Sequence, residues 1–158
     1  MRHVNPKQIA LLRAFNNQVL ACQDDAFTLA YLLLADVERA SDLVQKVFIR
    51  TYQEVADFAD SIRPRVFREI IETCNDRSQC RQSCFGGTYE DPILLALQQL
   101  SYDERCIAIL IDIMNLNYPE AAQVVGISHR CVRCLIARAR VDFLNRVKVM
   151  GETMAGDT

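Results

Sequence analysis

The chain has 158 residues, of which 51% are hydrophobic and 24% are charged. This length suits one ordinary domain or two small ones, and this balance excludes an intrinsically disordered chain. The formal net charge of −2 excludes a molecule that is basic all over, so a surface that binds a polyanion must be local.

We expect no targeting or membrane segment. The first residues, MRHVNPK, lead into an amphipathic pattern, and no run of about 18 apolar residues follows. The expected location is therefore the cytoplasm, without membrane insertion. The seven cysteines are an odd number, and a cytoplasm keeps thiols reduced, so we expect no disulfide framework.

Apolar residues recur every three or four positions, which predicts an all-α protein. The first expected helix covers residues 6–22. Asp24 and Asp25 are then expected to cap a second helix over residues 26–34, which is apolar nearly all round. A third helix is expected over residues 36–55. Residues 24–60 hold eight acidic and three basic residues, a pattern typical of a solvated face or of a face that docks a basic protein.

The helical spacing of apolar residues begins again after residue 58, with Pro64 in the first turn of a fourth expected helix. Residues 76–92 lose the periodicity and collect Gly, Ser, Asn and Asp, which predicts a flexible linker. We therefore expect two small helical domains, residues 1–75 and 93–150. Helices over residues 93–100 and 102–114 begin the second domain, and the tail after residue 150 is expected to fray. The outer side of the fourth helix and the residues after it carry Arg63, Arg65, Arg68 and Arg77.

The last part of the chain predicts a helix-turn-helix. Asn117 and Glu120 have the spacing of a capping box, and Gly126 stands where a helix can end in a left-handed conformation. Ser128 can cap a second helix, which is apolar on one face and basic on the other. The expected core positions are Ala121, Val125, Ile127, Val132, Leu135, Ile136, Ala139, Phe143 and Val147.

Charge favours a DNA-binding function for this second helix. Residues 128–148 hold six basic residues and one acidic residue, a local charge of +5 in a chain of net charge −2. The alternative is an ordinary helical hairpin whose arginines are merely solvated. The candidate DNA-binding residues are Ser128, His129, Arg130, Arg133, Cys134, Arg138 and Arg140.

Two stretches together resemble the extracytoplasmic-function group of bacterial RNA polymerase sigma factors. One is ASDLVQKVFIRTY at residues 40–52. The other begins with LSYDER at residues 100–105 and continues with YPEAA at residues 118–122, GIS at residues 126–128 and RAR at residues 138–140. This resemblance covers roughly two-thirds of the chain, and the predicted linker lies between the two stretches.

The resemblance implies a sigma factor that binds core RNA polymerase and directs it to specific promoters. In that family the first stretch grips the polymerase clamp, which implies a binding set of Asp42, Gln45, Lys46 and Phe48. The second stretch reads the −35 element of promoter DNA, and the arginines at positions 63, 65, 68 and 77 would contact DNA near the start site. An anti-sigma factor is a further partner that the resemblance implies.

The chain departs from the family pattern where the family melts the −10 element. The family has a Trp there followed by an Arg-Asn pair, whereas this chain has Val66 and Phe67, then Glu72 and Thr73, and no Trp anywhere. Cys131, Cys134 and Leu135 stand where Thr, Ser and Arg are common in the family. The alternative function is a sigma-like DNA-binding regulator that does not melt promoters.

The cysteines raise one further alternative, a zinc or redox sensor built from Cys74, Cys80, Cys84, Cys131, Cys134 and His129. A zinc site needs four convergent ligands, and nothing in the sequence brings these residues together. We therefore expect reduced thiols, without a metal or cofactor. The sequence also lacks a nucleophile with its base and a glycine-rich phosphate loop, so we do not expect an enzyme.

Overall fold

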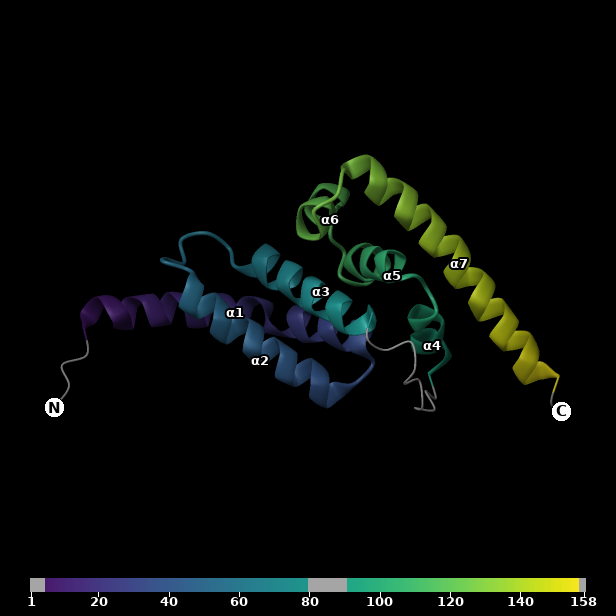
Figure 1. Ribbon diagram of the computed structural model, residues 1–158, viewed down its shortest axis with the longest axis horizontal. Helices are drawn as coiled ribbons and strands as arrows, with labels where there is room; N and C mark the ends of the chain where they lie inside the picture. Colours follow the sequence, from purple (N-terminus) through teal and green to yellow (C-terminus); the bar gives the residue numbers. More distant parts are fainter. Residues whose placement is uncertain (1–4, 80–90, 157–158) are drawn as a thin grey trace.

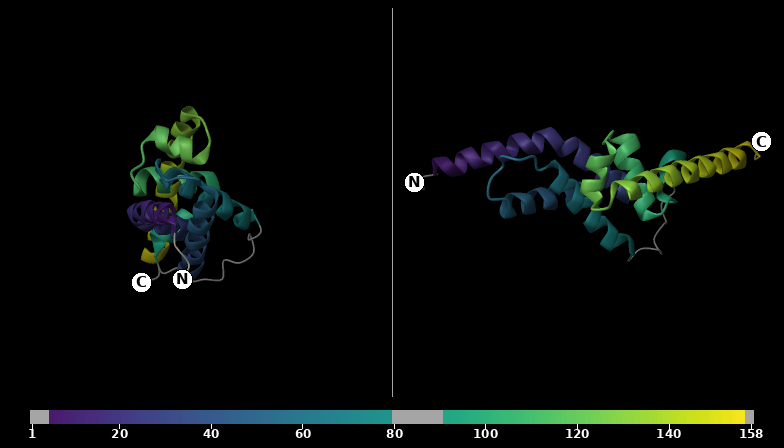
Figure 2. Two further views of the ribbon diagram at one scale, coloured as in Figure 1. Left: turned by 90° about the vertical axis from the view of Figure 1, so that its left-hand side faces the viewer. Right: turned by 90° about the horizontal axis from the view of Figure 1, so that it is seen from above.

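The computed structural model describes residues 5–79 and 91–156, and this part of the chain is entirely helical. The predicted all-α class is confirmed. Figures 1 and 2 show an elongated molecule in which the start of α1 and the end of α7 point away from each other. The elements are α1 (Pro6–Leu34), α2 (Val37–Glu54), α3 (Arg63–Gln79), α4 (Pro92–Gln98), α5 (Tyr102–Ala108), the π-helical η1 (Ile109–Ile113), α6 (Tyr118–Val125) and α7 (His129–Ala155).

Helix α1 is continuous over 29 residues, so the prediction of two helices separated by a cap at Asp24 and Asp25 is wrong. No Gly or Pro interrupts the chain there, and an aspartate inside a helix costs only about 0.7 kcal/mol relative to alanine. The buried residues Cys22, Ala26 and Leu29 continue one face across the expected break. Tertiary packing of that face therefore outweighs the weak local signal.

Helices α2 and α3 pack against α1 and complete the N-terminal part of the core. Asp36 caps α2, because its side chain accepts a hydrogen bond of 2.9 Å from the Arg39 N–H. The ring of Phe15 lies 5.1 Å from the Tyr52 ring and 5.0 Å from the Phe58 ring, which joins α1 to α2 and to the segment after it. The predicted inner face of α3 is buried at Val66, Phe67, Ile70, Ile71 and Cys74.

A single glutamine holds the segment between α2 and α3. The Gln18 amide donates to the carbonyl oxygens of Phe58 and Asp60, at 2.9 and 2.8 Å. Its oxygen accepts a hydrogen bond of 3.0 Å from the Ile62 N–H. Three backbone groups of the segment are thereby satisfied by one side chain of α1, which positions the start of α3.

The C-terminal part is built around α5, which contacts η1 and against which α7 packs. Ser101 and Glu104 form a capping box at the start of α5. Helix α7 continues to Ala155, so the prediction that the chain frays after residue 150 is wrong for these residues. Gly151 lies inside this last segment, and a single glycine costs a helix only about 1 kcal/mol.

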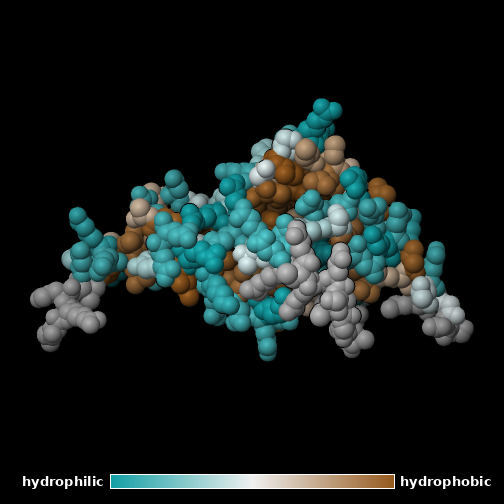
Figure 3. All heavy atoms as spheres, viewed as in Figure 1, coloured by the Kyte–Doolittle hydropathy of each residue, from teal (hydrophilic) through white to brown (hydrophobic). Residues whose placement is uncertain are grey.

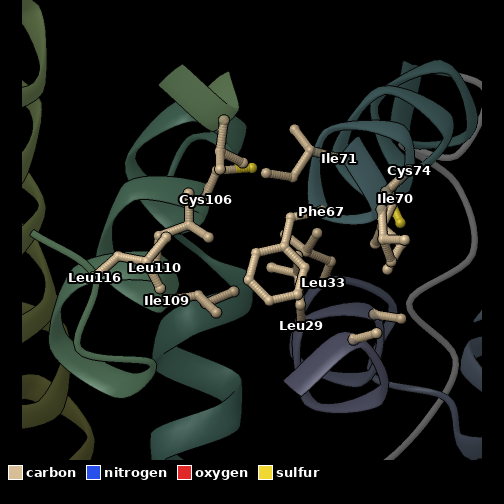
Figure 4. Close-up of a cluster of buried hydrophobic side chains, with 14 of the residues drawn as sticks. Leu29, Leu33, Phe67, Ile70, Ile71, Cys74, Cys106, Ile109, Leu110 and Leu116 are labelled. Atoms are coloured by element: carbon tan, nitrogen blue, oxygen red, sulfur yellow. The ribbon is translucent and has the colours of Figure 1, made fainter. Parts of the chain in front are cut away.

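The two parts share one hydrophobic core. Figure 4 shows Phe67 of α3 between Leu29 and Leu33 of α1 and the residues of η1, Ile109 and Leu110. Helix α3 continues to Gln79, past the predicted start of the linker, and residues 80–90 lie outside the described part of the chain. The division into two domains therefore stays a prediction.

None of the helices within residues 5–79 and 91–156 has the length and apolar character needed to cross a membrane.

Candidate nucleic-acid interface

Helices α6 and α7 have the start and stop signals that the sequence predicts. Asn117 accepts a hydrogen bond of 2.9 Å from the Glu120 N–H, and Glu120 accepts one of 3.0 Å from the Asn117 N–H. Ser128 caps α7 by accepting a hydrogen bond of 3.2 Å from the Cys131 N–H. The predicted capping box and cap are confirmed, and both helix starts are therefore specified by residues within four positions.

The turn between the helices depends on Gly126. Its backbone is left-handed, with φ of 77° and ψ of 32°, and its N–H donates to the Ala122 carbonyl at 2.9 Å. No heavy atom lies within 4 Å of the position that a Cβ would take. The position therefore favours glycine because of its backbone conformation and not because space is short.

The predicted core positions divide between the interior and its margin. Ala121, Val132, Ile136 and Ala139 are buried. Val125, Ile127, Leu135 and Phe143 are half-buried and pack against the edge of the core, and Val147 is also half-buried. Figure 3 shows apolar surface gathered over α6 and the start of α7.

Two arginines at the start of α7 are free. Arg130 and Arg133 are exposed, and neither side chain forms a hydrogen bond or ion pair with another residue in the described part of the chain. Ser128, His129 and Cys134 are exposed beside them, and the His129 ring lies 5.8 Å from the ring of Tyr118. This end of the helix therefore presents two uncompensated positive charges to solvent.

The next two arginines of α7 are paired within the molecule. Arg138 lies 3.1 Å from the carboxylate of Glu104, which is 4% exposed. Arg140 makes two hydrogen bonds to Asp112, at 3.1 and 2.6 Å, and these bonds raise the pKa of its guanidinium. Of the four predicted DNA-binding arginines of α7, two are therefore free and two are partly neutralised.

The predicted arginines of α3 are also engaged inside the molecule. Arg63 pairs with Asp25 at 2.8 Å and lies 5.0 Å from the centroid of the Phe67 ring. Arg65 pairs with Glu54. Arg68 donates to the carbonyls of Gln123 and Val124 at the end of α6. The Arg77 side chain lies outside the described part of the structure.

The predicted polymerase-binding residues lie on α2. Asp42, Gln45 and Lys46 are exposed on one face, whereas Phe48 is half-buried and packs against the core. Sequence reasoning missed Ile49, which is 58% exposed and lies four positions after Gln45 and three after Lys46. An isoleucine at that spacing on a polar face was the available signal. Asp42, Gln45, Lys46 and Ile49 together form the exposed stripe of α2, whereas the Phe48 side chain packs against the core.

The described cysteines do not gather into a metal site. Cys22, Cys74 and Cys106 are buried, and Cys131 and Cys134 are exposed on α7. Burial raises the pKa of Cys22 to about 11 and that of Cys106 to about 12. The part of the chain that the structure describes contains no group of three or more residues able to hold a metal ion, and Cys80 and Cys84 fall outside it.

This arrangement of helices is the fold of the extracytoplasmic-function sigma factors. No family model matches the chain, and no curated protein matches it in sequence. Several solved structures do match in fold, and these comparisons confirm the resemblance at the level of the fold.

Three of these structures illustrate the likeness. The sigma factor RpoE of Bartonella quintana, solved with the anti-sigma factor NepR, has a TM-score of 0.71 at 19% identity, over 85% of this chain and 97% of RpoE. CnrH, solved with the cytosolic domain of CnrY, has a TM-score of 0.68 at 22% identity, over 93% of this chain and 91% of CnrH. The extracytoplasmic function sigma factor SigJ of Mycobacterium tuberculosis has a TM-score of 0.59 at 23% identity, over 78% of this chain and 51% of SigJ.

Proposed function

We propose that this chain is a sigma factor that binds core RNA polymerase and directs it to specific promoters. The observation that carries the proposal is the free pair Arg130 and Arg133 at the start of α7, directly after the tight turn at Gly126. The first turns of a recognition helix are the part that reaches base edges in the major groove. The sigma factor fold over most of the chain supports the same function.

The ion pairs of α7 suggest which of its arginines contact bases and which contact phosphates. Arg130 and Arg133 have no internal partner in the described structure, so they can bind guanine edges without breaking an ion pair. Arg138 and Arg140 lie one to two turns later and are compensated by Glu104 and Asp112. They are better placed to contact phosphates, because a phosphate contact that positions the helix needs only a positive charge, even one that is partly compensated by a carboxylate.

Polymerase binding is assigned to the exposed stripe of α2. The side chains of Asp42, Gln45 and Lys46 form no hydrogen bond or ion pair within the described residues, so they are available to a partner. Ile49 adds an apolar contact to the same stripe. A polar stripe with one exposed aliphatic side chain is the composition expected of a protein interface with a small dry centre.

Run-off transcription tests this function. Purified core polymerase is mixed with the full chain and with linear DNA that carries the promoter of the chain's own gene. We expect a transcript of defined length with the wild-type chain, and a loss of most of it with the double variant Arg130→Ala, Arg133→Ala. An absent transcript, together with no binding of the chain to core polymerase, would overturn the proposal.

A specific observation supports a second candidate, a sigma-like DNA-binding regulator that does not melt promoters. Val66 and Phe67 stand where the family places its Trp, and both are core residues with exposures of 0% and 1%. Neither can stack on an unpaired base in this conformation. Permanganate footprinting separates the candidates, because reactive thymines near the start site require melted DNA. Promoter binding without such thymines would favour the regulator.

We also propose an anti-sigma factor as a partner. The support is the fold shared with RpoE of Bartonella quintana, which was solved with the anti-sigma factor NepR. The product of the gene adjacent to that of this chain is the first candidate. We expect it to suppress the run-off transcript in proportion to its molar ratio to the chain, and an unchanged transcript at excess would exclude that candidate.

A further inference from the structure

The start of α7 carries two cysteines on the surface that the proposed function assigns to DNA. Cys131 and Cys134 are exposed free thiols three positions apart, in the sequence CVRC. We propose that they form a reversible dithiol site, which a peroxide oxidises to a disulfide between them, and that this disulfide weakens DNA binding by α7. The effect on DNA rests on the proposed function, whereas the dithiol site does not.

These two thiols differ from the other described cysteines in their access to solvent. Cys22, Cys74 and Cys106 are at most 3% exposed. Cys131 and Cys134 lie on the exposed side of α7, and in Figure 1 the start of this helix lies at the outer edge of the molecule, beside α6. Among the described cysteines, a peroxide dissolved in water therefore reaches this pair first.

The surroundings of the pair are electropositive. Residues three and four positions apart are neighbours on a helix surface, so Arg130 and Arg138 lie one turn on either side of Cys134. Arg138 shares its charge with Glu104, whereas the side chains of Arg130 and Arg133 have no internal partner in the described structure. Oxidants select exposed cysteines beside such cations, above all where a second cysteine can complete a disulfide.

Two thiols are enough for a disulfide but too few for zinc. A structural zinc site needs four ligands. The part of the chain that the structure describes holds no group of three or more residues able to bind a metal ion. A disulfide needs only the two sulfur atoms and an oxidant. This face of α7 is therefore complete as a redox site and incomplete as a zinc site.

Oxidation by hydrogen peroxide proceeds in two steps. One thiolate attacks a peroxide oxygen, so that an S–O bond forms, the O–O bond breaks and hydroxide leaves. The second thiol then attacks the sulfur of this sulfenic acid, so that the S–S bond forms, the S–O bond breaks and water leaves. The pair loses two electrons and two protons, and the peroxide is reduced to two molecules of water.

Helix geometry allows this bond after a small local change. Positions i and i+3 of an α-helix have Cα atoms about 5 Å apart, within the range of about 4.4–6.8 Å found for disulfides. Their Cβ atoms lie about 5–6 Å apart, whereas a disulfide holds them about 3.5–4.5 Å apart. Closure must therefore draw the two Cβ atoms together by about 1–2 Å. A disulfide that strains its surroundings is more easily reduced, which makes this one reversible.

The change falls on the first two turns of α7. Val132 lies between the two cysteines and is fully buried, so the core holds it in place. The Cys131 N–H donates to the Ser128 side chain at 3.2 Å, which caps the helix. Closure therefore disturbs this cap and displaces the exposed Arg133, which lies between Val132 and Cys134. Because Arg133 is assigned to base edges, its displacement weakens DNA binding.

Peptide mass spectrometry tests the dithiol site in the full chain. The reduced chain is treated with hydrogen peroxide, blocked with N-ethylmaleimide and digested with trypsin without reductant. Trypsin cuts after Arg130, Arg133 and Arg138, so we expect the peptides CVR and CLIAR joined by a disulfide and separated again by dithiothreitol. The proposal would be overturned by a disulfide to Cys80 or Cys84, by a disulfide between two copies in non-reducing electrophoresis, or by no disulfide.

Fluorescence anisotropy with labelled DNA from the promoter of the chain's own gene tests the effect on binding. Oxidation should lower the affinity of the wild-type chain about tenfold, as expected for the loss of one arginine contact with a guanine edge, and dithiothreitol should restore it. Cys131→Ser cannot form the disulfide, so its affinity should be the same before and after peroxide. A tenfold loss in this variant would overturn the role of the disulfide.

Cys22→Ala is the matched control, since it removes a buried thiol and retains the exposed pair. Its affinity for the promoter DNA should fall on oxidation as that of the wild type does. Circular dichroism before and after peroxide checks that each variant keeps its helical content. If Cys22→Ala lost the response, the oxidised site would lie at Cys22 and the proposal would be wrong.

Thermodynamic linkage gives a second measurement of the effect on DNA. If the disulfide lowers DNA affinity about tenfold, bound DNA must favour the dithiol by the same factor. Saturating promoter DNA should therefore raise the reduction potential of the pair by about 30 mV, the equivalent of a tenfold change for a two-electron couple. Titration in dithiothreitol redox buffers measures this potential, and an unchanged value with DNA bound would overturn the effect on DNA.

The dithiol site and the proposed function can fail separately. A disulfide between CVR and CLIAR, in a chain whose reduced form binds neither the promoter DNA nor core polymerase, would refute the proposed function and support the dithiol site. A reduced chain that binds both partners and forms no disulfide with peroxide would support the proposed function and overturn the dithiol site.

Discussion

At the scale of single residues, we expect Arg133 of α7 to discriminate between base pairs and Arg140 to raise the affinity for all DNA sequences. Arg133→Ala should flatten preference at one or two base pairs, because an arginine on a guanine edge contributes about 1–3 kcal/mol of discrimination. Arg140→Ala should lower affinity for every sequence and reduce the salt slope by about one unit. Fluorescence anisotropy with a set of single-base operator variants measures both effects.

Asp112→Asn is the matched control, because it removes the negative charge and one of the two acceptor oxygens that face Arg140 without removing the arginine. Affinity for all sequences should then rise. If Arg133→Ala and Arg140→Ala lose affinity uniformly to the same extent, α7 holds only the DNA backbone and another surface reads the sequence.

The cysteines differ in reactivity for a physical reason. The thiolate is the reactive form, and burial raises the pKa of Cys22 to about 11 and that of Cys106 to about 12. At pH 8 iodoacetamide should therefore label the exposed Cys131 and Cys134 well before these two, as peptide mass spectrometry can measure. Labelling of Cys106 at the rate of Cys134 would show that the core around α5 opens far more often than its packing allows.

At the scale of helices, the turn before α7 is the most sensitive position. Gly126→Ala should destabilise the fold by about 1–2 kcal/mol, because a non-glycine residue is strained in the left-handed conformation. Gly151→Ala is the control, since this glycine lies inside α7 with open space around it and should gain about 0.5–1 kcal/mol. Urea unfolding measures both. Equal effects of the two changes would mean that the turn is not specified by its backbone conformation.

Variants of α2 should distinguish residues that bind core polymerase from residues that stabilise the fold. Asp42→Ala together with Gln45→Ala should weaken binding to core polymerase with little change in Tm, because both side chains are exposed and without partners in the described structure. Ile49→Ala should act in the same direction. Phe48→Ala should lower Tm, since that ring packs against the core. Surface plasmon resonance measures the affinity for core polymerase, and differential scanning calorimetry measures Tm. If the Asp42, Gln45 variant lost both affinity and Tm, these two residues would serve the fold and not the binding of polymerase.

At the scale of the whole molecule, stability should fall in alkaline solution. Burial raises the pKa of Cys22, Cys106 and Tyr102, so the folded state retains protons that the unfolded chain has already released. The contribution of these groups is fully present below pH of about 8.5, where unfolded thiols begin to ionise. It is lost as pH rises towards the folded pKa values, about 11 for Cys22 and about 12 for Cys106.

Urea unfolding at pH 8, 9.5 and 10.5 measures this dependence. Cys106→Ala is the control: it should be less stable than wild type at pH 8 but should lose less stability between pH 8 and pH 10.5. A wild-type midpoint that stays constant over this range would contradict the assigned role of burial.

The sequence by itself determined the all-α class, the caps of α6 and α7 and the turn at Gly126, but not the continuity of α1 past Asp24 and Asp25. Each of these features depends on residues within about four positions of one another, as in the capping box of Asn117 and Glu120 and the cap at Ser128. Local hydrogen bonding and backbone conformation act at that range, so the pattern of residue types is enough to predict them. The α2 stripe followed from the same periodicity, except that Ile49 was missed.

The tertiary structure decided how charges and backbone groups far apart in the chain meet. Arg130 and Arg133 look like Arg138 and Arg140 in sequence, yet only the latter pair face carboxylates, at Glu104 and Asp112. The bridge from Gln18 to the segment before α3 and the donation from Tyr102 to Ile71 join residues 31 or more positions apart. Such contacts depend on which helix faces pack together, a choice set by the burial of apolar area over the whole core and not by any local pattern.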